Sequence, residues 1–424
     1  MTTPHDEAFL EAAASLGRRL CRDALWAGDR CNWLGDAVEP VGGAMRVVHR
    51  ALGPDLYGGT SGVALFLAVL HRLTGEAPFR VTAEGAIAQA LSRAEDIPPA
   101  ARIAFYSGWT GIAYVLATVG AAFERMELVE RAYALIASAA RTAGPEVEFD
   151  VMVGAAGAIP ALISLQSHER PDDLIALATR LGEHLVANAR KSDVGWSWKT
   201  LEGQTERDAT GFSHGAAGIA WSLLELFAAT GSDRFREGAE CGFAYERQWL
   251  NKANENWPDF RLMPSASSDS GTLGYSAAWC HGAPGIGLSR LRAYELLGGE
   301  VMRQEAEVAI RTTTRSLNSE AGLRQGDFCL CHGRGGNAEL LIYAADALGD
   351  DAARAGAEAV GRQGIEIFGR KNLPWPCGVP DGGETPNLML GLAGIGYFYL
   401  RLYDPANVPS VLIIRPPDDR RWTD

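Results

Sequence analysis

The stretch "SHGAAGIAWSLLEL", Ser213–Leu226, joins a Gly-x-x-Gly element directly to an apolar segment with the length of a helix. The same arrangement recurs along the whole chain. The seven glycine pairs are Gly59–Gly62, Gly108–Gly111, Gly154–Gly157, Gly215–Gly218, Gly282–Gly285, Gly333–Gly336 and Gly391–Gly394. One such pair is weak evidence, because isolated glycines mark many kinds of turn. Seven pairs, each opening an apolar helix, indicate an internal structural repeat.

The segments after the glycine pairs, such as Val63–Leu73, are apolar on nearly all sides, which is typical of helices that are buried all round. Amphipathic segments lie between them, and residues 172–190 show one stripe of leucines at helical spacing. Seven inner helices that alternate with seven outer helices predict an all-α fold, the α/α toroid or double barrel. We expect residues 1–424 to form a single domain, with an extended crossing between Gly218 and Gly282.

Composition excludes several classes of function. The chain has 424 residues and a formal charge of −13, which argues against nucleic acid as a partner. The N-terminal segment is acidic and then amphipathic, unlike a signal peptide, and no apolar run is long enough for a membrane span. We therefore predict a cytoplasmic protein. Its seven cysteines, an odd number, argue against a disulfide framework and leave metal binding, nucleophilic chemistry or burial.

Two successive repeats carry cysteine and histidine directly before the glycine pair. Cys280 lies in "WCHGAPGIG" and Cys331 in "CHGRGGN", where His332 follows it. If equivalent loops meet at one mouth of the toroid, these three side chains become neighbours. Two thiolates and one imidazole suit a tetrahedral Zn²⁺ site whose open fourth position is typical of catalytic zinc. Burial of each cysteine as a small apolar residue is the alternative.

These motifs, together with "SHGAAGI" at Ser213–Ile219, make the chain resemble the lanthipeptide cyclases, the LanC family, along nearly its whole length. The motif "WCHGAPGIG" is most similar to the cyclase region of bifunctional LanM enzymes. The resemblance implies a zinc-dependent cyclase that adds cysteine thiols to dehydroalanine or dehydrobutyrine. The products are lanthionine or methyllanthionine thioether rings. The implied partners are a dehydrated precursor peptide with its leader and a separate dehydratase, for which this chain has no room. The family's ligand is the cysteine directly before histidine, which assigns Cys329 to the core.

Three residues are the candidates for catalysis. His214 is the leading acid or base, and we expect it to occupy the repeat position of Cys280 and Cys331 and to face the same mouth. Asp150 matches the family's active-site aspartate and could orient His214 or take the thiol proton; the alternative is a helix N-cap or loop anchor. His281, beside Cys280, is a candidate second proton donor, or a residue that orients the metal ligands without binding the metal.

The chain departs from the stand-alone bacterial cyclases at one position. Those enzymes carry arginine four residues before the first zinc cysteine, where this chain has Ser276, so any role of that arginine in stabilising an oxyanion is in doubt here. Arg334 is a conjectured source of positive charge at the mouth.

Three other functions remain open at this stage. One is addition of glutathione or another small thiol, as in eukaryotic LanC-like proteins. Another is a scaffold that retains zinc only for stability, against which Asp150 and His214 count. An α/α-barrel glycosidase would need two carboxylates facing each other across the mouth, where these loops offer Cys and His.

Overall fold

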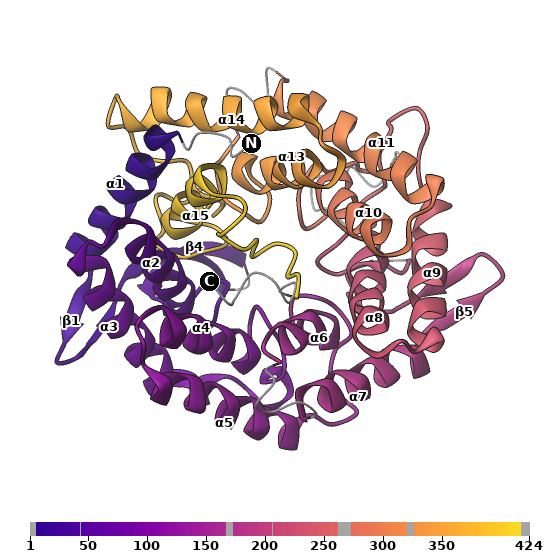
Figure 1. The fold of residues 1–424 in the computed structure, drawn as a ribbon, viewed down its shortest axis with the longest axis horizontal. Helices are drawn as coiled ribbons and strands as arrows, with labels where there is room; N and C mark the ends of the chain where they lie inside the picture. The colour runs from indigo at the N-terminus through magenta and orange to yellow at the C-terminus, as the bar shows by residue number, and fades with distance from the viewer. Residues whose placement is uncertain are drawn as a thin grey trace.

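The computed structural model describes residues 6–42, 44–166, 173–205, 207–261, 273–319 and 326–416. Fourteen α-helices in these residues form an inner ring surrounded by an outer ring (Figure 1). The inner helices are α2 (Thr60–Thr74), α4 (Trp109–Ala122), α6 (Ala155–Ser164), α8 (Ala216–Thr230), α10 (Ala283–Leu297), α13 (Arg334–Leu348) and α15 (Leu392–Tyr403). The outer helices are α1 (Glu7–Asp23), α3 (Ala77–Arg93), α5 (Met126–Thr142), α7 (Asp173–Ala187), α9 (Asp233–Arg247), α11 (Glu300–Leu317) and α14 (Asp351–Gly364). The predicted toroid of seven inner and seven outer helices is confirmed.

The glycine pairs are required because each inner helix begins against the loop that precedes it. The first glycine of every pair is the N-cap of its helix. The second glycine packs against a carbonyl oxygen of the loop. A Cβ atom at Gly218 would lie 2.0 Å from the carbonyl oxygen of Phe212, and one at Gly336 would lie 1.8 Å from that of Leu330. Because real Cβ atoms do not approach that closely, another residue would push the helix away from its loop.

The loops that precede the inner helices are joined by main-chain hydrogen bonds. The amide of Ser213 donates to the carbonyl of Cys280, Cys280 donates to Cys331, Cys331 to Met389, and Met389 to Tyr57, over 3.0–3.2 Å. Each of these five residues stands two positions before its glycine pair. The bonds confirm that the loops of successive repeats converge at one end of the ring, which we call the mouth.

The ring is closed by the two ends of the chain. Helix α1 packs beside α15, so the first helix in sequence is the outer partner of the last inner helix (Figure 1). The rings of Phe9 in α1 and Tyr399 in α15 lie 6.2 Å apart between centroids. Every inner helix thereby gains an outer partner, and no apolar face of α15 is left uncovered on that side.

Three antiparallel hairpins accompany the helices and were not predicted. They are β1 (Leu25–Ala27) with β2 (Arg30–Asn32), β3 (Leu34–Val41) with β4 (Ala44–Ala51), and β5 (Arg190–Ser192) with β6 (Gly195–Ser197). Residues 248–261 and 273–282 contain no helix, which agrees with the predicted extended crossing; residues 262–272 of that crossing lie outside the described part. The single domain over 1–424 stays a prediction. None of the described helices is long and apolar enough to traverse a bilayer.

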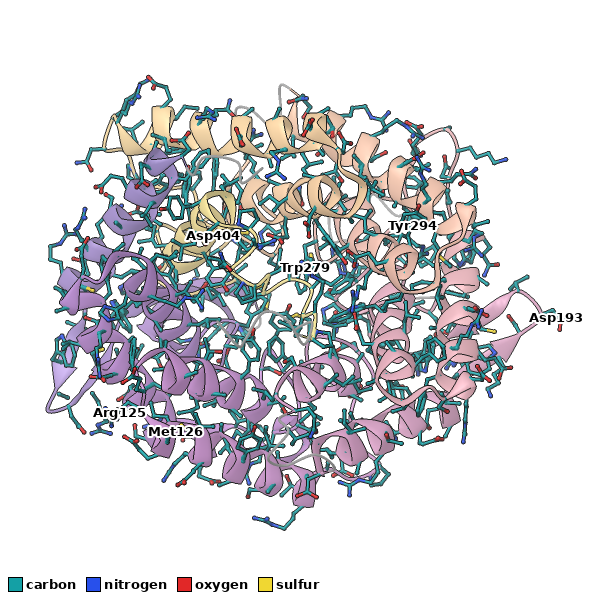
Figure 2. The ribbon with its side chains drawn as sticks, in the orientation of Figure 1. Arg125, Met126, Asp193, Trp279, Tyr294 and Asp404 are labelled. Atoms are coloured by element: carbon teal, nitrogen blue, oxygen red, sulfur yellow. The ribbon has the colours of Figure 1, made fainter. Side chains whose placement is uncertain are left out.

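The segment after α15 runs back into the ring. The hydroxyl of Tyr106 donates to the carbonyl of Val411 over 2.6 Å, and the indole of Trp279 donates to that of Leu412 over 2.9 Å. Figure 2 labels Trp279 near the centre of the ring. Its side chain is completely buried and packs against the rings of Tyr106 and Phe212, directly before Cys280 in the chain.

Candidate metal centre

The loops before α10 and α13 bring the three predicted metal ligands together. One ligand atom each from Cys280, Cys331 and His332 lies within 4.8 Å of the other two. The main-chain bond between Cys280 and Cys331 fixes the relative position of the two loops. Cys331 is buried and the His332 side chain is 36% exposed, so the group is accessible from the mouth.

The donor set fits a zinc ion. Tetrahedral zinc with Zn–S bonds of about 2.3 Å places two sulfurs about 3.8 Å apart, which small side-chain rotations can reach from the present separation. Nε2 of His332 lies 3.0 Å from the carbonyl oxygen of Gly378. Because a carbonyl only accepts, Nε2 must carry the proton, which leaves the lone pair of Nδ1 for a metal. The structure thus provides two thiols and one oriented imidazole, three ligand atoms from the described residues.

The two thiols differ in acidity. A hydrogen bond from the Cys331 thiol lowers the pKa of Cys280 against the effect of burial, and the charges of Arg261 and His214 lower it further. The same hydrogen bond raises the pKa of Cys331, and burial raises it further.

A second group shares His332. Asp327, Cys329 and His332 also place one ligand atom each within 4.8 Å of one another. Cys329 is completely buried, as predicted, and burial raises its pKa well above the ordinary value. A cavity of about 440 Å³, lined by Asp327, His332 and residues 374–384, opens beside this group. Two ligand sets therefore compete for one imidazole, and thiolate softness favours the set with two cysteines.

Asp150 and His214 form a close pair at the mouth. Oδ2 of Asp150 lies 2.6 Å from Nδ1 of His214, and Oδ1 accepts the amide of Val153 over 2.7 Å. Asp150 thus acts as loop anchor and histidine partner at once. The Asp150 side chain is 3% exposed and that of His214 is 25% exposed. Because a carboxylate can only accept a hydrogen bond, the proton of a neutral His214 lies on Nδ1. Nε2 is then left for other partners.

The predicted repeat position of His214 is wrong by one residue. In the main-chain ladder it is Ser213 that pairs with Cys280, so Ser213 is the equivalent of Cys280 and Cys331. His214 shares the next position with His281 and His332. The imidazoles of His214 and His281 nevertheless lie 5.9 Å apart between centroids, beside the metal group.

His281 follows Cys280 and is not one of the three residues in the group of Cys280, Cys331 and His332; its role stays a prediction. Its side chain is 2% exposed, and Nδ1 lies 3.9 Å from Oδ1 of Asp259. Burial, with the charge of Arg261, lowers the pKa of His281 to about 3. Nε2 has no hydrogen-bond partner in the described part of the chain. His281 is a neutral imidazole with one unused nitrogen.

The sequence analysis missed Asp259 and Arg261, which come from the crossing segment. Nη2 of Arg261 lies 2.6 Å from Oδ2 of Asp259, and the hydroxyl of Ser276 donates to the same oxygen over 3.2 Å. Burial lowers the pKa of Arg261, but the hydrogen bonds and charge of Asp259 outweigh this effect. The charges of Cys280 and Cys331 also raise it, so the pKa lies above its ordinary value. The crossing has no repeat, so no pattern pointed to these two residues.

The conjecture that Arg334 supplies charge at the mouth is wrong. Its guanidinium donates to the carbonyl of Leu317 over 3.0 Å and to the side chain of Gln363 over 2.7 Å. These partners belong to α11 and α14 of the outer ring. The side chain therefore points from the start of α13 away from the mouth.

Comparison with known proteins agrees with this geometry. The family model described as lanthionine synthetase C-like protein matches residues 50–413. The chain belongs to this family. The structure of this LanC-like protein is similar to that of nisin cyclase, with a TM-score of 0.62 and 17% identity over 82% of this chain and 88% of that one. A likeness at this identity establishes the fold.

Two curated relatives have different names. Lacticin 481/lactococcin biosynthesis protein LcnDR2 of Lactococcus lactis subsp. lactis is 24% identical over 213 residues, 48% of this chain and 21% of the relative. Glutathione S-transferase LANCL1 of Danio rerio is 26% identical over 204 residues, 47% of this chain and 44% of the relative. The matched region is thus less than half of either relative, and the two are similarly distant from this LanC-like protein.

Proposed function

We propose that this LanC-like protein adds a cysteine thiol of a dehydrated precursor peptide to a dehydroalanine or dehydrobutyrine of the same peptide. The observation that carries the proposal is the meeting of Cys280, Cys331 and His332 next to the Asp150–His214 pair. A thiol-binding metal group and a proton-exchanging group are the two components that this addition needs.

The chain's own thiols and imidazole would hold Zn²⁺. Zinc bound by Cys280, Cys331 and His332 would offer its fourth position to the substrate thiol and lower the pKa of that thiol. The sulfur bonds to the β-carbon while the π electrons of the double bond move toward the carbonyl and form an enolate. The thiol loses one proton and the α-carbon gains one, so the reaction needs no oxidant or reductant.

We assign the proton exchange to His214. With Nδ1 committed to Asp150 at 2.6 Å, Nε2 is the nitrogen that can accept the thiol proton or return one to the α-carbon. Asp150 is a positioning residue, because it fixes the ring and its tautomer and stabilises the imidazolium. His281 is a further candidate for contact with the substrate, since its buried Nε2 has no partner among the described residues.

A second candidate function is the addition of glutathione to a dehydrated peptide. The similarity to the Danio rerio protein, whose name is glutathione S-transferase, favours it. The same metal group and the same histidine would serve either thiol. The two functions differ only in whether the nucleophile belongs to the acceptor peptide.

One experiment separates these functions. The zinc-loaded protein is incubated with a synthetic peptide that has one dehydroalanine and one cysteine. Cyclisation leaves the mass unchanged and removes one iodoacetamide-reactive thiol. A cysteine-free peptide with glutathione tests the second function, which adds the mass of one glutathione. If neither reaction exceeds that of a His214→Ala control, the scaffold that binds zinc only for stability is the better explanation. The separate dehydratase and the leader peptide stay predictions.

A further inference from the structure

Arg261 is a cation next to the thiols that no step above uses. It follows Asp259 by two residues, and Asp259 lies 3.9 Å from His281, the residue after Cys280. Asp259, which lies 2.6 Å from Nη2 of Arg261, thus places the guanidinium beside the loop that carries Cys280.

The guanidinium is held in a fixed orientation. Nε and Nη2 of Arg261 form a fork on the carboxylate of Asp259, at 3.0 and 2.6 Å. The Asp259 carboxylate is 5% exposed and also accepts the Ser276 hydroxyl. The main chain on both sides is pinned, because Arg261 forms a bridge with Thr205 and the Asp259 amide donates to Gly274 over 2.8 Å. A side chain held at both ends loses little entropy when it binds a ligand.

One edge of the guanidinium remains available. Nη1 of Arg261 has no hydrogen-bond partner in the described residues, and the side chain is 34% exposed. Two other arginines of the inner helices are committed elsewhere: Arg334 donates to Leu317 and Gln363, and Arg290 is completely buried between Glu246 and Glu305.

We propose that Arg261, positioned by Asp259, forms an anion-binding subsite that contacts the acceptor carbonyl oxygen as it becomes an enolate oxygen. The proposal rests on the function proposed above, and it adds the residue that receives the negative charge. A preorganised donor aimed at the developing charge stabilises the transition state more than the ground state. The guanidinium comes from the crossing segment and contacts the same carboxylate as Ser276.

The test uses two small thiols and needs no peptide substrate. In 3-mercaptopropionate, two carbons separate the sulfur from the carboxyl carbon, as in the product of thiol addition. 2-Mercaptoethanol has no anionic group. Binding of each to the Co²⁺-loaded protein is followed through the sulfur-to-cobalt absorption band. Charge-assisted hydrogen bonds predict that the wild type binds mercaptopropionate about 10- to 100-fold more tightly than mercaptoethanol.

Arg261→Gln should abolish this preference and leave the affinity for mercaptoethanol unchanged. Arg261→Lys should keep part of it, and the exposed control Arg311→Gln should keep all of it. If the preference survives in Arg261→Gln, or if the wild type shows none, the subsite is refuted while the proposed function stands. If neither thiol changes the cobalt spectrum of a protein that binds the metal, the proposed function itself fails.

Discussion

Replacing Cys280 or Cys329 by alanine decides which of the two ligand sets holds zinc. Both sets contain His332 and both fall within the same 4.8 Å limit, so distance alone does not separate them. The type of ligand does separate them, because one set offers two soft thiolates and the other offers one thiolate and a carboxylate. We expect Cys280→Ala to lose zinc and Cys329→Ala to keep it.

The magnitude follows from the number of ligands. Mutation of residues that orient metal ligands weakens metal binding by about 10- to 100-fold. Removal of one of three protein ligands should therefore weaken zinc binding by more than about 100-fold. At a zinc concentration 100 times the wild-type Kd, binding stabilises the folded protein by about 2.7 kcal/mol. With an unfolding entropy of about 2.1 cal/mol/K per residue, the 424-residue chain should gain about 3 °C in Tm.

The assay combines elemental analysis of zinc after dialysis, competition with a chromogenic chelator, and thermal melts with and without zinc. Wild type and Cys329→Ala should hold one zinc per chain and gain about 3 °C. Cys280→Ala should show neither property. The opposite pattern, with zinc lost in Cys329→Ala and retained in Cys280→Ala, would refute the assignment of the two-cysteine set.

Three further changes test other parts of the structure. Asp150→Asn should retain zinc but slow thiol addition by about 10²- to 10⁴-fold, because an amide in place of Oδ2 favours the other tautomer of His214; a rate within threefold of wild type contradicts this. Gly336→Ala should lower the free energy of unfolding by about 3 kcal/mol or more, since its Cβ would meet the loop carbonyl at 1.8 Å. At the helical Gly356 a Cβ would meet only the end of the Leu341 side chain at 3.3 Å, so Gly356→Ala should change that free energy by less than about 1 kcal/mol in the same urea titration. Arg290→Met leaves the buried Glu246 without its cation, while Glu305 keeps Arg247, and should reduce that free energy by about 3–5 kcal/mol. An unchanged urea midpoint would contradict a charged Glu246 in the wild type.

The sequence predicted those parts of the molecule that repeat. Each glycine pair is required by the contact between a helix and the loop directly before it. The pattern can therefore be recognised within a short stretch of sequence. Cys280 and Cys331 could be placed together because they hold the same position in neighbouring repeats. The repeat position of His214 was predicted one residue too early because its loop has Ser213 where the two later loops have a cysteine. The residue types therefore did not show how this loop aligns with the others.

The rest depends on contacts that no repeat encodes. Arg261 and Asp259 reach the site from the irregular crossing, and their role rests on where Ser276 and His281 happen to lie. Whether the Arg334 side chain faces the mouth or the outer ring is decided by acceptors on α11 and α14, far away in sequence. The three hairpins are short or exposed, so burial left little alternation of apolar and polar residues in them.

The closure of the ring by α1 and α15 has a consequence for synthesis on the ribosome. Of the described helices, α1 is synthesised first and its partner α15 last. Until α15 is made, the part of α1 that packs on it, including Phe9, therefore lacks its native cover, although α2 and α3 can already contact α1. Contacts between such distant segments form slowly. The last step of folding should thus be the docking of the first helix, and a chaperone that binds nascent chains would find its target there.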